Sequence, residues 1–169
     1  MAFLEWLQAS SFARWIQEDG SIFAYPMILT FHTFGMAFLV GTSVAIDLRI
    51  LGVARQIPLA PMEKLYPVMI IGFWMNVISG ALLFAPEAVR WAFNPDFLLK
   101  MLLVCLGMPN VWLIRRRVFL NGAGQDAAST GGRILAATSI LIWVAAITTG
   151  RLTAYVDSWS KFKELFVTI

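Results

Sequence analysis

Long apolar stretches, separated by short polar or proline-containing segments, dominate this chain of 169 residues. A helix needs about 20 predominantly apolar residues to cross the hydrocarbon core of a bilayer. Four stretches meet this requirement. We therefore predict four membrane-spanning helices, at about residues 24–46, 66–85, 97–114 and 134–156.

The overall composition supports this interpretation. Apolar residues make up 59% of the chain and charged residues 14%, against roughly 45–50% and about 25% in soluble domains. A soluble domain of this size could not bury so much apolar surface, whereas a bilayer covers it. We expect an all-α protein, a four-helix transmembrane bundle that forms a single integral membrane domain over residues 1–169.

Both ends of the chain carry amphipathic segments that are too polar to span a membrane. Residues 2–18 contain the large aromatic side chains of Trp6, Phe12 and Trp15. Ser10 and Ser11 predict a break and a helix cap within this segment. The C-terminal tail is similar, with Trp159 and Phe162 beside Lys161 and Lys163. We expect short interfacial helices at both termini.

The charges of the short loops predict the orientation, because cytoplasmic loops carry an excess of Lys and Arg. The loops after the first and third spans hold seven basic residues: Arg49, Arg55, Lys64, Arg115, Arg116, Arg117 and Arg133. The opposite side holds four: Arg14, Arg90, Lys161 and Lys163. This asymmetry predicts that both basic loops are cytoplasmic and that both termini lie outside.

Polar residues within the predicted spans are candidates for a functional site, because a charge at the centre of a span costs about 2.5–3.5 kcal/mol. His32, the only histidine, lies about 12 Å below the outer boundary at 1.5 Å per residue. Lys100 lies near the start of the third span. Arg151 lies near the end of the fourth, with Tyr155 one turn further on the same face. The predicted topology places all four residues in the outer third of the membrane.

A neutral imidazole at depth, with two cations nearer the surface, suits an amphiphilic cofactor. In haem b, His32 would be the axial metal ligand, and Lys100 and Arg151 would pair with the propionates. A quinone head group hydrogen-bonded by His32 and Tyr155 is an alternative. Each residue also has a structural explanation, since Lys100 and Arg151 can extend to the interface and Tyr155 can belong to an interfacial aromatic belt.

A copper-handling function has its own candidate residues. Met101, Cys105 and Met108 share one face of the third span, and His32 and Met36 share a face of the first. Sulfur and imidazole ligands suit Cu(I). Methionine is also an ordinary filler of apolar cores, so we rank copper below haem.

Other features are better explained by packing, or they exclude whole classes of function. Gly72, Asn76 and Gly80 recur every four positions in the second span and predict a close contact with another helix. The sequence shows no nucleophile–base pair, paired carboxylates or phosphate-binding glycine loop, so hydrolytic catalysis is not expected. It also has no basic surface segment interleaved with aromatic residues, so nucleic-acid binding is not expected.

Five segments are distinctive and together extend over nearly the whole chain: FLEWLQAS, FHTFGMAFLVGTSVAIDLRILG, SGALLF, NPDFLLKMLL and GRLTAY. They resemble an uncharacterised family of small bacterial membrane proteins with four spans. The resemblance implies the same bundle in a bacterial inner membrane. It implies no activity, because that family has no settled function.

His32 and Lys100 also carry a more distant resemblance. A first-span His followed by small and apolar residues is similar to the copper-resistance D family and to the membrane protoporphyrinogen oxidase family. The oxidase family also has a Lys early in a later span. In that family this His and Lys are associated with haem b and activity, which is what the resemblance implies for His32 and Lys100. The aromatic and arginine patterns that flank the His in that family are absent here.

Taken together, these observations favour a membrane protein that holds a haem b type redox cofactor near its outer face and acts as an electron-transfer subunit. The expected surroundings are the lipid bilayer, with other membrane or periplasmic redox subunits as partners. A second axial His would need a second subunit of a homo-oligomer, because one chain has only His32. Lys, Met or an open sixth site are the alternatives. The alternatives are a non-catalytic accessory subunit of a larger complex and a copper-handling protein. Whether the protein is an enzyme stays open.

Overall fold

The computed structural model describes residues 1–120 and 129–155, with side chains as far as Leu152. All regular structure in these ranges is helical, which confirms the predicted all-α class. The four long helices are α3 (Tyr25–Leu51), α4 (Tyr66–Phe84), α6 (Pro95–Ile114) and α7 (Thr130–Tyr155). The shorter elements are α1 (Ala2–Gln8), α2 (Ser11–Glu18), η1 (Ala60–Leu65), η2 (Ala85–Glu87), α5 (Ala88–Ala92) and η3 (Arg115–Leu120).

Four helical segments are long and apolar enough to cross a membrane: Tyr25–Leu51, Ala60–Ala92, Pro95–Leu120 and Thr130–Leu152. Each of them overlaps one predicted span. Their outward surfaces carry large apolar side chains, and Ile71 and Leu141 are 58% and 71% exposed. Such surfaces are unfavourable in water but are covered by lipid tails, as expected for a membrane protein.

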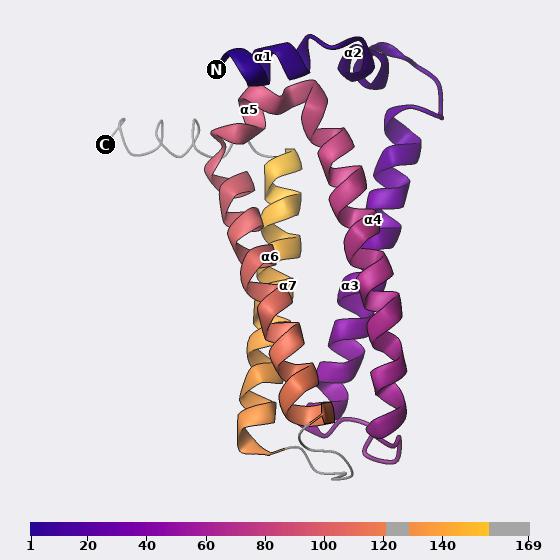
Figure 1. The fold of residues 1–169 in the computed structure, drawn as a ribbon, viewed down its shortest axis with the longest axis vertical. Helices are drawn as coiled ribbons and strands as arrows, with labels where there is room; N and C mark the ends of the chain where they lie inside the picture. Colours follow the sequence, from indigo (N-terminus) through magenta and orange to yellow (C-terminus); the bar gives the residue numbers. More distant parts are fainter. Residues whose placement is uncertain (121–128, 156–169) are drawn as a thin grey trace, which may run out of the picture.

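The long helices form two pairs. α3 packs against α4, α6 packs against α7, and α3 also contacts α7. The pairs lie close together at the lower end of Figure 1 and diverge towards the upper end. The main cluster of buried apolar side chains accordingly lies mostly in the lower half, with these large members: Ile46, Ile50, Tyr66, Met69, Ile114 and Phe119.

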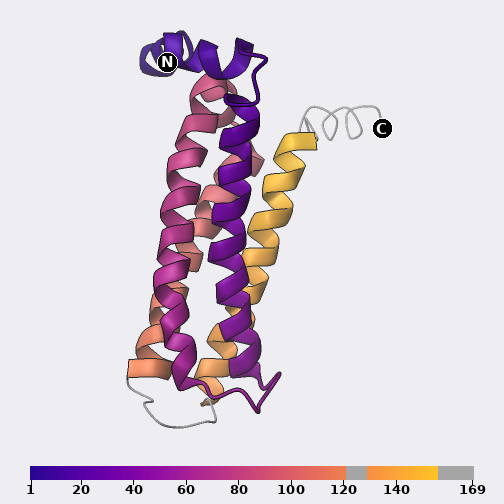
Figure 2. The ribbon, with the colours of Figure 1, turned by 90° about the vertical axis from the view of Figure 1, so that its right-hand side faces the viewer.

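The two ends of the bundle differ in what covers them. α1 and α2 lie across the upper end, at a steep angle to the long helices (Figures 1 and 2), and we call this the capped end. The lower end, which we call the basic end, holds the polypeptide around Arg55, the arginines of η3 and the start of α7. The predicted C-terminal interfacial helix lies outside the described residues.

The predicted break within the N-terminal segment is confirmed. The Ser10 hydroxyl accepts a hydrogen bond from the backbone N–H of Ala13, 3.2 Å away, and so caps α2. Ala13 and Ile16 are completely buried. Because α2 contacts η2, this apolar face anchors the helix on the bundle.

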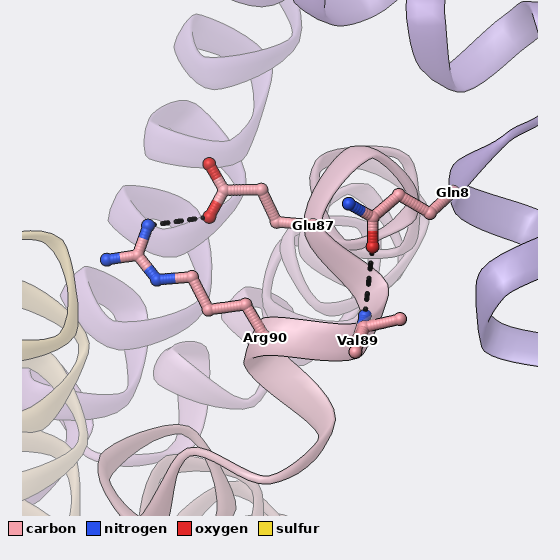
Figure 3. A network of polar contacts seen from close by, with 4 residues as sticks. All are labelled: Gln8, Glu87, Val89 and Arg90. Atoms are coloured by element: carbon pink, nitrogen blue, oxygen red, sulfur yellow. Dashed lines mark hydrogen bonds and ion pairs between the residues drawn. The ribbon is translucent and has the colours of Figure 1, made fainter. Parts of the chain in front are cut away.

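A second contact holds α1 in place. The side-chain oxygen of Gln8 accepts a hydrogen bond from the backbone N–H of Val89 in α5, at 3.4 Å (Figure 3). On the same short helix, Arg90 forms an ion pair with Glu87 at 2.9 Å. The contact of Gln8 ties the N-terminal segment to the connection between α4 and α6.

α3 and α4 approach each other unusually closely. A Cβ atom at Gly72 would lie 2.6 Å from the backbone nitrogen of Leu39, and one at Gly35 would lie 2.8 Å from that of Asn76. Real Cβ atoms do not tolerate such distances, so both positions require glycine. The predicted small face of the second span is therefore a packing surface, and it fixes how α3 is placed against α4.

Candidate functional site

His32 lies half-buried on α3, near the capped end, with its ring against α4. Its Nδ1 atom is 3.0 Å from the hydroxyl oxygen of Ser79. Its backbone carbonyl accepts a hydrogen bond from the Asn76 side chain at 2.9 Å. Gly80 provides the room, because a Cβ there would lie 3.3 Å from the Cε1 atom of His32. The small face of α4 therefore holds both the ring and the backbone of His32.

The partners of Ser79 determine which nitrogen of His32 carries the proton. The Ser79 hydroxyl donates to the backbone carbonyl of Met75 at 2.5 Å, and the carbonyl of Asn76 lies 3.4 Å away. A hydroxyl has only one hydrogen, and a carbonyl can only accept. Ser79 must therefore accept from His32, which places the proton on Nδ1. The Nε2 atom then carries no proton and keeps a lone pair.

Lys100, on α6, faces a cavity between the two helix pairs. The cavity is small, with a volume of about 40 Å³. All four long helices line it, with these residues among others: Met36, Phe73, Asn76, Lys100, Val104 and Trp143. Apart from the indole of Trp143, the polar side chains of this lining are Asn76 and Lys100.

The side chain of Lys100 lies against α7. A Cβ at Gly150 of α7 would lie 3.5 Å from the Cδ atom and 3.8 Å from the Nζ atom of Lys100, so the side chain runs along this glycine. His32 is not among the residues that line the cavity. Asn76 links the two, because it lines the cavity with Lys100 and donates to the backbone carbonyl of His32.

The other two predicted site residues have different outcomes. Arg151 is exposed on α7 and does not line the cavity, although it directly follows Gly150. The side chain of Tyr155 lies outside the part of the chain that the structure describes. The geometry therefore centres the candidate site on His32 and Lys100.

The sulfur side chains of the copper hypothesis lie elsewhere on α6. Met101 is 38% exposed and Cys105 is exposed. The cavity is lined instead by Lys100 and Val104, on a neighbouring face of the same helix. Among residues 1–120 and 129–152, no three His, Cys, Asp or Glu side chains gather as a metal site.

The buried polar residues that were not identified in the sequence include Ser79 and Asp47. Ser79 follows Asn76 by three positions and directly precedes Gly80. The small face of the second span could therefore have indicated that Ser79 lies at a helix contact. Asp47 lies just after the predicted end of the first span at residue 46, but α3 continues to Leu51 and buries it. Its spacing of four from Ser43 places both on one helix face.

Comparison with known proteins identifies a family. A family of unknown function (DUF6644) matches residues 3–156. The chain belongs to this family. No curated protein and no solved structure matches the chain. Membership in DUF6644 agrees with the resemblance to a family without a settled function, and the function must be argued from the site itself.

Proposed function

We propose that this DUF6644 protein holds a haem b type cofactor between its two helix pairs and acts as an electron-transfer subunit. One observation carries the proposal: the Nε2 atom of His32 keeps a lone pair while Ser79 holds Nδ1. A metal-ligating histidine almost always donates its other N–H to a partner that fixes the tautomer and the ring. The more distant resemblance to the protoporphyrinogen oxidase family at His32 and Lys100 supports the same ligand.

The donor set suits haem: His32 would hold the iron and Lys100 would pair with a propionate. Met36, which lines the cavity, or His32 of a second copy would supply a second ligand. Bound haem would supply one-electron chemistry. The room for haem is limited, because this cavity is smaller than usual cofactor pockets, which measure about 300–1,000 Å³. Phe84 of α4 and Phe97 of α6 stack with their ring centroids 5.5 Å apart, so binding would require the two helix pairs to separate.

The proposal includes a location and an orientation. The basic end would lie in the cytoplasm of a bacterial cell, because the loops after the first and third spans carry the excess of Lys and Arg that is typical of cytoplasmic loops. The capped end, with His32 and Lys100, would then lie near the outer face of the inner membrane. Electron exchange with membrane or periplasmic redox subunits follows from this placement.

The absorption spectrum of the purified protein tests the proposal. We expect a Soret band that shifts on dithionite reduction and is lost in His32→Ala. The four apolar spans should still insert without this side chain. Thr33→Ala is the matched control, because the Thr33 hydroxyl is exposed and bonds only to Leu29 of its own helix, at 2.9 Å. A Soret band fully retained in His32→Ala would exclude His32 as the ligand.

A quinone head group is the second candidate, because the small cavity volume favours it. Lys100 can donate a hydrogen bond to a quinone carbonyl, and Nε2 of His32 can accept one from the hydroxyl of the reduced quinol. Chromatography of the lipids that copurify with the protein should then show a bound quinone, depleted in Lys100→Gln. A protein with neither haem nor quinone would favour an accessory subunit.

A further inference from the structure

A second group of polar side chains lies between α3 and α7, towards the basic end. Asp47, Ser43 and Ser139 are 1%, 2% and 0% exposed, respectively. Ser43 and Asp47 are one turn apart on α3, and Ser139 belongs to α7. The indole N–H of Trp143 donates to the Ser43 hydroxyl at 3.1 Å. Asp47 lies fifteen positions beyond His32 on α3, about 22 Å along the helix, so this group is separate from the site of His32.

The carboxylate of Asp47 has no compensating charge among the described residues. Its Oδ1 atom makes no hydrogen bond, and its Oδ2 atom interacts with the Ser43 hydroxyl at 3.4 Å. Arg49 is the nearest cation in sequence. It follows Asp47 by two positions, and residues with this spacing lie on opposite sides of a helix. The Arg49 guanidinium instead donates to the backbone carbonyls of Ile57 and Arg55.

The neighbouring helices supply no counter-ion either. Tyr66, on α4, is buried, and a phenol carries no positive charge that could balance a carboxylate. Arg115 lies over that ring, 5.4 Å from its centroid, and is paired with Glu63 at 3.3 Å. A buried carboxylate without a compensating charge is strongly disfavoured. A positive charge that is not part of the described chain must therefore accompany Asp47.

The oxygen atoms around Asp47 indicate the kind of charge. The Ser43 hydroxyl donates to Oδ2 of Asp47 at 3.4 Å, and its oxygen lies 3.3 Å from the Ser139 oxygen. Oδ1 of Asp47 has no partner among the described residues. Carboxylate and hydroxyl oxygens are hard ligands, which suit cations such as Na⁺ or Ca²⁺ rather than soft metals.

We propose that Asp47, Ser43 and Ser139 form a binding site for a monovalent metal cation, with Na⁺ as the probe. The single carboxylate balances one positive charge, which favours Na⁺ over Ca²⁺. Trp143 occupies one lone pair of the Ser43 oxygen and leaves the other available to the ion. The site is independent of the proposed cofactor.

Thermal unfolding of the purified full-length protein tests the site. The protein is prepared free of sodium, and NaCl is added against choline chloride at constant ionic strength. A ligand that binds only the folded state raises the unfolding temperature with its concentration. We expect a saturable rise with Na⁺ that is absent in Asp47→Asn and needs at least tenfold more Na⁺ in Ser139→Ala. Glu18→Gln, which removes an exposed carboxylate, is the control and should respond as the wild type does.

Equilibrium dialysis with radioactive Na⁺ provides a direct measurement and needs only the wild-type protein, even if Asp47→Asn fails to fold. We expect one ion per chain. No bound Na⁺ and no Na⁺-dependent stability would overturn the proposal. An infrared band of a protonated carboxyl group, present in the wild type in sodium buffer and lost in Asp47→Asn, would also overturn it, because a proton would then supply the positive charge.

Discussion

The Nδ1 atom of His32 lies 3.0 Å from the Ser79 hydroxyl, and this contact determines which nitrogen of the ring is free to act. Ser79 uses its hydrogen on the carbonyl of Met75 in its own helix. His32 must therefore donate from Nδ1, and Nε2 becomes the available ligand or hydrogen-bond acceptor. A serine on α4 thus sets the chemistry of a histidine on α3.

Ser79→Ala should weaken the retention of haem without abolishing it, because the axial ligand stays while its orienting partner is lost. The loss of an outer partner of a metal ligand typically costs about 10–100-fold in affinity. Haem titration of the apoprotein, followed at the Soret band, measures the change. Thr30→Ala is the control, since that exposed hydroxyl bonds only to the carbonyl of Pro26, at 2.8 Å. Unchanged affinity in Ser79→Ala would argue against the proposed role of the contact.

Substitution of the two cations should have unequal effects. Lys100→Gln should weaken the retention of an anionic cofactor by about 1.5–3 kcal/mol, the range for a charged hydrogen bond. Arg151→Gln should have little effect, because Arg151 is exposed and outside the cavity lining. Cofactor occupancy of both single variants and of the double variant, in matched detergent, is the measurement. Large, non-additive losses in both single variants would place Arg151 in the same site.

The contact between α3 and α4 can be tested at two glycines of one helix. Gly35→Ala should destabilise the bundle by about 1–3 kcal/mol, as overpacking does, because the added Cβ would meet the backbone of α4 at 2.8 Å. Gly41→Ala is the matched control. No atom lies within 4 Å of a Cβ at Gly41, so alanine there should be neutral or stabilising. Thermal unfolding followed by circular dichroism should separate the two variants. Equal stability would contradict the close approach.

Cysteine labelling tests the orientation. In a Cys105→Ser background, Glu18→Cys marks the capped end and Ser129→Cys marks the basic end, and both positions are exposed. A membrane-impermeant maleimide added to intact cells should label Glu18→Cys and leave Ser129→Cys unlabelled until the membrane is opened. The reverse pattern would move His32 and Lys100 to the cytoplasmic side.

Local features of the sequence determined the architecture. Four apolar stretches separated by polar segments sufficed to predict the four long helices, because a bilayer requires that length and that composition. Ser10 likewise predicted its own cap, since an N-cap depends only on residues a few positions away. The depth of His32 and Lys100 along their helices followed in the same way.

The tertiary structure decided what each side chain faces. The depth of a residue is set along its own helix, but its direction depends on how the helices rotate against one another, and this follows from contacts such as that of Gly35 with Gly72. Hence Lys100 lines the cavity whereas Arg151 is exposed. The same packing joins Ser79 to His32, which lie in different helices far apart in the sequence. It also buries Asp47, which lies just beyond the predicted end of the first span. No local sequence pattern contains either relationship.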